Sequence, residues 1–450
     1  MRLHRPLLLA GPVLAALVTA GFTTYARHQN VDAPRSSDWL SLLPSGDTKS
    51  RFILDCTGCH QFDAQIARPS GQRRTTEDWK AATLRMLGFA GATTGFPVIA
   101  HDRDADRTAA WLSEHAAKAP SIAARPALPA GAQITEYDLP EPQDLAHDVA
   151  IDSGGAILVT GMFSHVMYSL DTTTKRFDAV PIPVSGNANP RAVEVDAKGD
   201  WWVVLGSPRL LARYSVSRLK WDIWPVGMYA HSVAIDPAGQ AWVNGHFTKD
   251  PIQIVRVDPS TGATSTVDLP IHPALSREPG GPIPYEIRSA PDGVIWMSEL
   301  RGNRIISHDP RSGASKAYGM PAPHMGPRRF DIDRDGALWI PAYAANELVR
   351  FDPRSGEFTR HTLPISDALP YVVRVDPSDG TVWIGSGAAD AMFAFAPATG
   401  RFTTYPLPSR GAMVRHMAID PRSHDVWIAY GASPGRIPSR IARLRRVIGD

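Results

Sequence analysis

A repeat marked by tryptophan constrains the fold of this chain most strongly. Six tryptophans and one leucine recur at the same place in successive units, at steps of mostly 40 to 44 residues: Leu158, Trp202, Trp242, Trp296, Trp339, Trp383 and Trp427. One step is longer, because residues 271–284 are inserted between the third and fourth units. Each unit alternates apolar and polar residues between closely spaced turn signals, which excludes a helical solenoid. A period of this length is typical of the four-stranded blade of a β-propeller.

The two ends of the repeat region predict how the ring of blades closes. The last unit begins at Arg415 and has only three strands, the third at about Arg440–Val447, before the chain ends. The segment Gln133–Pro140 has the same character as the outermost strands of earlier units, such as Phe402–Pro408. Pairing that segment with the last unit would remove an open sheet edge. The sequence therefore predicts an all-β, seven-bladed β-propeller over residues 133–450.

The two cysteines of the chain lie in one motif, Cys56-Thr57-Gly58-Cys59-His60. A C-x-x-C-H motif is typical of covalent haem c attachment, in which the thiols form thioethers to the haem and the histidine binds the iron. A zinc half-site would need a second pair of ligands, and a thioredoxin-type motif would need a flanking βαβ pattern. A simple disulfide would leave His60 unexplained. We therefore predict haem c attached to Cys56 and Cys59, with His60 as an axial ligand of the iron.

A helix with a threonine cap is predicted after this motif, and Trp79 and Met86 fall on one of its faces. Residues 45–118 resemble the small c-type cytochrome modules attached to periplasmic enzymes, which share C-x-x-C-H followed by a W-x(5 to 6)-R-M helix. The resemblance implies that Met86 is the second axial ligand. An ordinary core methionine is the alternative. A second helix, Asp104–Ala117, is expected to close the far side of this small all-α domain with Trp111.

The first residues of the chain predict export. A short basic segment, Met1–Arg5, precedes an uncharged apolar stretch, Pro6–Phe22, as in a secretory signal. The stretch is close to the lower limit for a membrane span, so a cleaved signal peptide and an uncleaved N-terminal membrane anchor both remain open. The expected location is periplasmic. The predicted organisation is a signal peptide or anchor at 1–28, a cytochrome c domain at 29–118, a Pro/Ala-rich linker at 119–132 and the propeller at 133–450.

The repeat also resembles a known family. Its units combine P-(H/Y/R)-x-(I/V), G-x-(I/L)-W, N-x-(I/L) and D-P-x-(S/T)-G with a Y-x-L-P strand, and Pro284–Ile305 is the clearest copy. This pattern is similar to that of the virginiamycin B lyase (streptogramin lyase) propellers, over residues 133–447. The resemblance implies a seven-bladed propeller that opens a lactone by elimination, using a magnesium ion, two channel histidines and a glutamate.

Alignment of the units places seven residues at the start of the innermost strands, and we call them the ring residues: His147, Arg191, His231, Tyr285, Arg328, Tyr371 and Arg415. None is aliphatic, which predicts a polar channel mouth, and the three arginines favour a small anionic ligand such as a carboxylate. A channel that only holds water is the alternative. Glu299 is the only acid at the aligned end of the second strands, which makes it a candidate base or divalent-metal ligand.

The lyase resemblance assigns two of these residues directly. His231 matches the first family histidine and Glu299 matches the glutamate, but Tyr285 stands at the second histidine position. Because the reference pKa of tyrosine is about 10, Tyr285 is a poor general base, and antibiotic-lactone elimination is not the expected reaction. His246 could replace the second histidine, or it could be a surface loop residue.

Two functions follow from these patterns, and whether the chain is an enzyme stays open. The first is an exported haem c electron-transfer protein, with a ligand-binding propeller and a redox partner protein in the periplasm or membrane. The second is a metal-dependent lyase or hydrolase that uses Glu299, His231 and Mg²⁺, with the cytochrome as an accessory domain. A structural interaction platform is a third reading. The net charge of +2 gives no basis for nucleic-acid binding.

Overall fold

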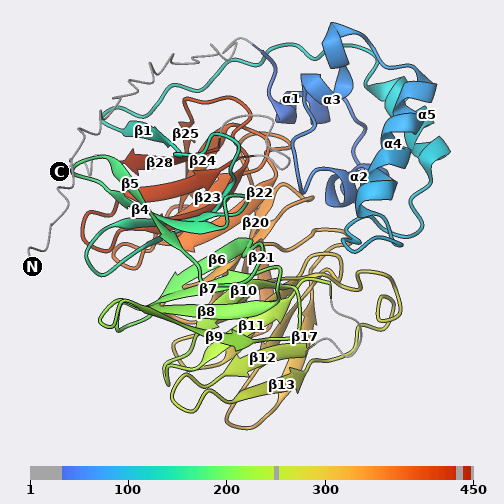
Figure 1. Cartoon of the computed structure of the whole chain (residues 1–450). Coiled ribbons are helices and arrows are strands. Elements are labelled where there is room, and N and C mark those ends of the chain that lie inside the picture. Colours follow the sequence, from blue (N-terminus) through green and yellow to red (C-terminus); the bar gives the residue numbers. More distant parts are fainter. Residues whose placement is uncertain (1–32, 248–252, 432–438, 447–450) are drawn as a thin grey trace, which may run out of the picture.

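The computed structural model describes residues 33–247, 253–431 and 439–446. The predicted signal or anchor at residues 1–28 lies outside these residues. Helices occupy the N-terminal part of the described chain and strands the rest (Figure 1). The seven-bladed propeller predicted from the repeat is confirmed, since the described strands form seven four-stranded sheets. Among the described helices, none has the length and apolar character needed to cross a membrane.

The N-terminal part is a small all-α unit, as predicted. Its helices are α1 (Ser36–Leu40), α2 (Asp47–Cys56), α3 (Ala64–Ala67), η1 (Pro69–Gly71), α4 (Thr76–Ala90) and α5 (Ala105–His115). Thr75 caps α4, where its hydroxyl accepts from the backbone N–H of Asp78 and the Asp78 carboxylate accepts in return. Phe52 of α2 packs on Phe62 and on Trp111 of α5, with ring centroids 5.4 and 5.5 Å apart. These helices therefore share one aromatic core.

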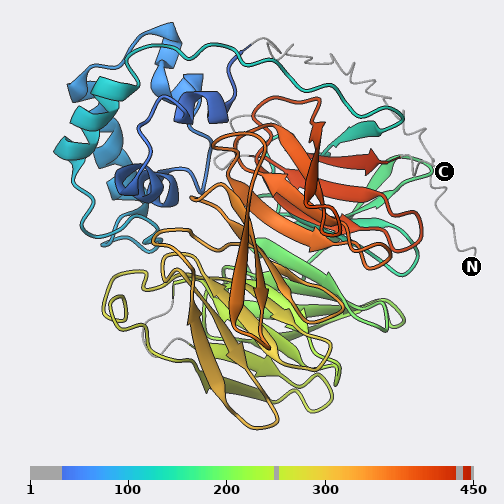
Figure 2. The ribbon, with the colours of Figure 1, turned by 180° about the vertical axis from the view of Figure 1, so that it is seen from behind.

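Residues 116–132 connect the helices to the first strand without regular structure of their own. The segment runs along the side of the propeller built from the C-terminal strands (Figures 1 and 2). It delivers the chain to the outer edge of the last blade.

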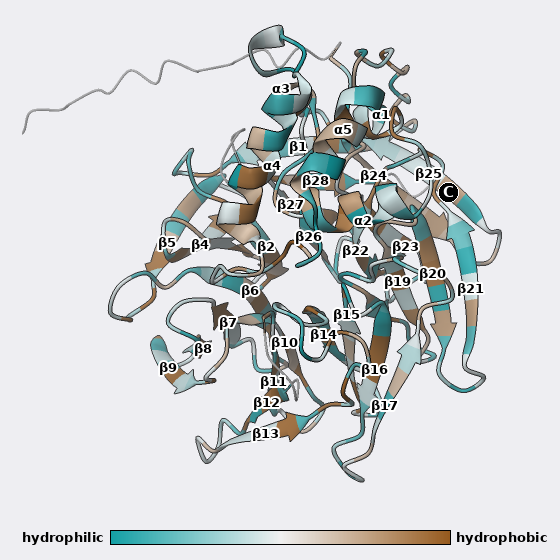
Figure 3. Ribbon diagram, turned by 90° about the vertical axis from the view of Figure 1, so that its right-hand side faces the viewer, coloured by the Kyte–Doolittle hydropathy of each residue, from teal (hydrophilic) through white to brown (hydrophobic). Residues whose placement is uncertain are grey.

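The blades follow one another in chain order, each running from an innermost to an outermost strand. Their strands are β2–β5 (Ala146–Ile151, Ile157–Gly161, Val166–Asp171, Arg176–Pro181), β6–β9 (Pro190–Val195, Trp201–Leu205, Leu210–Ser215, Lys220–Pro225), β10–β13 (Ala230–Ile235, Ala241–Gly245, Gln253–Val257, Thr264–Asp268), β14–β17 (Pro284–Ser289, Ile295–Glu299, Arg304–His308, Ser315–Gly319), β18–β21 (Asp331–Ile332, Leu338–Ala342, Glu347–Asp352, Glu357–Thr362), β22–β25 (Pro370–Val375, Val382–Ser386, Ala391–Ala396, Arg401–Pro406) and β26–β28 (Val414–Ile419, Val426–Tyr430, Arg440–Arg445) with β1 (Gln133–Asp138). The innermost strands surround a common centre (Figure 3).

The last blade closes through the N-terminal strand, as the sequence predicts. Strand β1 pairs antiparallel with β28, from Gln133 opposite Arg445 to Asp138 opposite Arg440. Ion pairs from Arg440 to Glu136 and Asp138 reinforce the register. The closure leaves β28 paired with a strand on both sides, so it has no unpaired edge where the first and last strands of the propeller meet.

The repeated tryptophans lie on the second strand of their blades and are buried between sheets. In three blades the indole Nε1 donates to the aspartate that follows the innermost strand: Trp202 to Asp196, Trp242 to Asp236 and Trp339 to Asp333, at 2.8–2.9 Å. In these blades, the aspartate of the turn and the tryptophan of the repeat are therefore hydrogen-bonded to each other, which stabilises the hairpin of the two inner strands.

The helical unit packs on the propeller at one end of the channel. One cluster of buried apolar side chains continues from Trp39 and Phe52 into Leu300, Tyr343 and Leu369 of the propeller. Polar contacts surround it: Lys49 pairs with Asp367 at 2.7 Å, the backbone N–H of Ser37 donates to the Ala388 carbonyl, and Arg301 donates to the Val98 carbonyl. The helical unit thus caps the channel mouth.

Candidate functional site

The ring residues point into the channel because the innermost strands bulge at these positions. In β10, Ala230 pairs with Gly245 and Ser232 with Asn244, so that His231 is left out of the ladder. The same shift recurs in β2, β6, β14, β22 and β26. Arg328 precedes the short strand β18, between bridges made by its two neighbours. A bulge re-aims one side chain, and its repetition builds the ring.

All seven ring residues line one cavity of about 210 Å³. His246 also lines it, and the helical unit contributes Gly58, Cys59 and Phe89. The cavity therefore lies between the Cys-x-x-Cys-His segment and the channel mouth. The sequence predicted both groups of residues but gave no reason to expect them together.

Specific contacts hold the Cys-x-x-Cys-His segment on the ring. The hydroxyl of Tyr343 donates to the Thr57 carbonyl at 2.9 Å and lies 2.9 Å from the Thr57 hydroxyl. Arg415 donates to the Cys59 carbonyl at 2.7 Å. A Cβ at Gly58 would lie 2.9 Å from Nη2 of Arg328, so a larger residue here would have to displace this guanidinium. The segment is docked on the propeller through its backbone.

The donor set of this segment fits haem c. Cys56 and Cys59 are free thiols rather than a disulfide, and burial raises the pKa of Cys56 to about 12. The Nδ1 of His60 lies 3.1 Å from the Gln61 carbonyl, which can only accept, so the ring carries its proton there and its lone pair on Nε2, the tautomer that binds a metal. Met86 and Phe89 of α4 are 39% and 61% exposed, an apolar surface of the kind that a haem covers. The axial role of Met86 stays a prediction.

Aromatic and cationic side chains of the ring contact one another closely. The hydroxyls of Tyr285 and Tyr371 are 2.5 Å apart, and Arg328 donates to the Tyr285 hydroxyl. The Arg328 guanidinium also lies 3.9 Å from the ring centroid of Tyr343 and 4.3 Å from that of Tyr371. Burial raises the pKa of Tyr285. Burial opposes ionisation of Tyr371 as well, but Arg328 and Arg415 outweigh it and lower its pKa.

The histidines of the cavity are neutral. His231 and His246 stack with ring centroids 4.3 Å apart, and each donates from Nδ1 to a backbone carbonyl of β14. Burial, and then neighbouring cationic groups, hold both pKa values well below the usual range. Burial likewise lowers the pKa of His147 to about 4. Neutral imidazoles with a protonated Nδ1 can accept a proton or a hydrogen bond at Nε2.

The structure does not bring Glu299 to this cavity, contrary to its predicted role. Its carboxylate is fully buried and forms an ion pair with Arg304, with 3.0 Å between Oε1 and Nη2. Arg304 in turn donates to the carbonyls of Pro270 and Ile271, in the inserted segment before β14. Glu299 therefore anchors the insertion. Among the described residues, no group of three or more His, Cys, Asp or Glu side chains could hold a metal ion.

Sequence reasoning left the role of His246 open and missed Tyr343, although both stand one position beyond the end of a second strand. His246 and Tyr343 follow the aligned ends of β11 and β19, and both are buried at the mouth. The repeat could have identified both residues, because the position that follows the aligned end of each second strand is His246 in one unit and Tyr343 in another. His246 is not a surface loop residue, since it is 5% exposed and lines the cavity.

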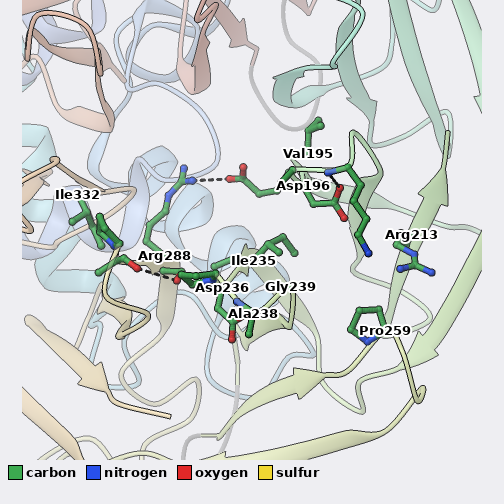
Figure 4. A pocket seen from close by; sticks show the side chains of 18 of the residues that line it. Val195, Asp196, Arg213, Ile235, Asp236, Ala238, Gly239, Pro259, Arg288 and Ile332 are labelled. Carbon is green, nitrogen blue, oxygen red and sulfur yellow. Dashed lines mark hydrogen bonds and ion pairs between the residues drawn. The ribbon is translucent and has the colours of Figure 1, made fainter. Parts of the chain in front are cut away.

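Buried ion pairs fill the channel behind the ring. Arg329 bonds to Asp148 at 2.9 Å and lies 3.7 Å from Glu286, while Arg374 lies 3.5 Å from Glu286. At the opposite mouth, a separate pocket of about 640 Å³ contains the Arg288–Glu194 ion pair, 2.7 Å between charged atoms (Figure 4). Acids and arginines are both present at that mouth, whereas the described lining of the capped cavity contains arginines and no acid.

Comparison with known proteins supports the propeller fold. A model of the virginiamycin B lyase family matches residues 275–437. No curated protein gives a significant match.

Solved structures similar to this chain include lyases and one enzyme of another activity. Virginiamycin B lyase from Staphylococcus aureus superposes with a TM-score of 0.61 at 17% identity, covering 70% of this chain and 100% of the lyase. A streptogramin B lyase gives 0.60 at 18% identity, over 70% and 97% of the two chains. Hydrazine synthase of Kuenenia stuttgartiensis gives 0.54 at 14% identity, over 70% and 99%. At these identities the likeness establishes the propeller fold.

Proposed function

We propose that this chain is an exported haem c protein whose propeller holds a small molecule beneath the haem attachment segment, with electrons passing between that molecule and the haem. The observation that carries the proposal is the shared cavity: Cys59 and Gly58 line the same space as all seven ring residues. A redox partner protein of the periplasm or membrane would complete the electron path.

The residues divide into those that hold the haem and those that face the small molecule. Cys56 and Cys59 would form the thioethers, with His60 and Met86 as axial ligands. Haem c supplies one-electron oxidation and reduction when it is attached. The chain's own part is to bind and orient the small molecule and to exclude water from it. The neutral His231 and His246 can each accept a hydrogen bond at Nε2 and so orient the bound molecule.

A titration of the oxidised protein with reduced small metabolites, without oxygen, tests this function. A substrate should reduce the haem, as followed by its visible absorbance. His246→Phe should slow that reduction at least about tenfold, because it removes a hydrogen-bond acceptor that orients the bound molecule in the cavity. Arg213→Gln, at the opposite mouth, is the control and should leave the rate unchanged. If His246→Phe and the control reduce at the parental rate, electrons do not enter through this cavity.

A metal-dependent lyase is the second candidate, and the match to the virginiamycin B lyase family favours it. The stacked pair His231 and His246 offers two histidines at the mouth. The ion pair of Glu299 with Arg304 speaks against the predicted metal site. Magnesium-dependent opening of a streptogramin B lactone, lost in His246→Ala, would establish this activity. Absence of turnover with Mg²⁺ present would remove it.

A further inference from the structure

Arg191 differs from the other arginines of the cavity because two of its guanidinium nitrogens, rather than one or none, are buried without a hydrogen-bond partner among the described residues. The side chain is 5% exposed, and neither Nε nor Nη1 has a hydrogen-bond partner among the described residues. Its guanidinium lies over the ring of Tyr229, 4.7 Å from the centroid. A Cβ at Gly206 would come within 2.8 Å of Arg191 Cδ, so this glycine leaves room for the side chain. The fold therefore makes space for a buried arginine that it does not pair.

The other two ring arginines each donate hydrogen bonds to the protein, although the Nε of Arg328 also has no partner among the described residues. Arg328 donates to the Tyr285 hydroxyl, and Arg415 donates to the carbonyls of Gly431 and Cys59. Leaving buried donors unpaired is costly to the folded state. An arginine in this condition inside a cavity is arranged for a ligand that completes its hydrogen bonds.

The surroundings of Arg191 select a small anion. The described lining of the cavity contains three arginines and no aspartate or glutamate, and the histidines are neutral. The cavity of about 210 Å³ is smaller than the roughly 300–1,000 Å³ typical of sites for drug-sized ligands, so its size favours a small carboxylate.

We propose that the guanidinium of Arg191, whose Nε and Nη1 have no hydrogen-bond partner among the described residues, binds a carboxylate group in this cavity, which the Cys-x-x-Cys-His segment also lines. This inference deepens the proposed function by naming the class of ligand. The carboxylate has two possible sources, a free small carboxylate or a propionate of the attached haem, and both present the same group to the fork of the guanidinium.

The effect of acetate on thermal unfolding of the full-length protein tests the assignment. Millimolar acetate should raise the melting temperature of the parent, because a ligand that binds only the folded state stabilises it. Arg191→Gln should melt at or above the parental temperature without acetate, since it removes an unpaired buried charge, and should lose the response to acetate. Arg191→Lys keeps the charge but not the fork, and should respond at least tenfold more weakly in acetate concentration. Arg213→Gln is the control and should respond as the parent does.

The haem reduction potential distinguishes the two sources. If the carboxylate is a propionate of the haem, Arg191→Gln shifts the potential with no acetate added, and acetate changes the melting temperature of neither protein. If it is a free carboxylate, the acetate response depends on Arg191. The proposal is overturned if Arg191→Gln changes neither the potential nor the acetate response, in which case the cavity holds only water. A chain purified without haem would contradict the proposed function, yet the acetate experiment would still decide the role of Arg191.

Discussion

Single hydroxyl and amide contacts determine how the helical unit sits on the propeller. The Tyr343 hydroxyl meets both the carbonyl and the hydroxyl of Thr57, and Thr57 is 1% exposed. Gln61 donates to the Gly387 carbonyl at 2.9 Å on the neighbouring blade. Because these groups are buried, no water can replace a lost partner, and each contact contributes more than a surface hydrogen bond would.

Tyr343→Phe should therefore lower the free energy of unfolding by about 1–3 kcal/mol, since it leaves the Thr57 carbonyl buried without its donor. Chemical denaturation measures the loss. Tyr318→Phe, on the outermost strand β17, is the matched control and should change stability by less than about 0.5 kcal/mol. Equal stabilities of the two variants would mean that the Tyr343 contact is not made in solution.

The buried neutral histidines predict a dependence of stability on pH. Their folded-state pKa values lie below the unfolded value of about 6.5, with His147 at about 4, so the unfolded chain binds the protons first. Their contribution is complete above pH about 6.5 and is lost as the pH falls toward 4. Each such histidine should lower the free energy of unfolding by about 1.5 kcal/mol between pH 6.5 and 5, because its unfolded-state counterpart is already half protonated at pH 6.5.

Denaturant unfolding at pH 6.5 and pH 5 measures this loss. His147→Gln should reduce the difference in the free energy of unfolding between pH 6.5 and pH 5 by the contribution of one histidine. Tyr318→Phe, which removes no histidine, is the control and should leave the difference as in the parent. If His147→Gln shows the full parental difference, His147 is not neutral in the folded protein.

At the scale of secondary-structure elements, most of the propeller could be predicted because each signal recurs in register. The tryptophan positions predicted the second strands, and the residues before them predicted the ring. The repeat could not show which partner a side chain contacts at its aligned position. Glu299 occupies the aligned position correctly, but an arginine five residues later draws its carboxylate into an ion pair. A one-dimensional pattern records positions along strands and not the partners across them.

The closing strand β1 gives a prediction about edges. A chain that lacks residues 1–118 keeps β1, whereas a chain that lacks residues 1–142 loses it and leaves β28 with an unpaired edge. The first should remain monomeric and the second should aggregate, because an exposed strand edge pairs with other chains. Size-exclusion chromatography compares them. Both chains lack the helical cap, so the comparison isolates the strand, and identical behaviour would contradict the closure.

Helix α4 gives a prediction about the iron. Met86 is 39% exposed on the surface of α4, as a ligand of an attached haem would be before the haem covers it. Met86→Ala should abolish the weak sulfur-to-iron absorption band while the haem stays attached through its thioethers. Met320→Ala, on the propeller, is the control and should retain the band. A band that persists in Met86→Ala would exclude Met86 as the ligand.

At the scale of the whole molecule, the proposed function depends on an arrangement that no local pattern contains. Thr57 and Tyr343 are 286 positions apart in sequence, and Cys59 and Arg415 are 356 apart. The two halves were each predictable, one from a five-residue motif and the other from a repeat. Their docking was not, because the contacts use backbone carbonyls and a tyrosine outside the aligned positions. Because the helical unit docks on the propeller, the cysteine motif and the ring residues line the same cavity.

The mass of the intact protein, purified after export, tests covalent haem attachment most directly. We expect the mass of the processed or unprocessed chain plus one haem, and we expect the haem to be retained through acid–acetone extraction because thioether bonds hold it. Cys56→Ala combined with Cys59→Ala should give the mass of the chain alone. A parental protein that shows the mass of the chain alone, or that releases its haem into acid–acetone, would contradict covalent haem attachment to the cysteine motif.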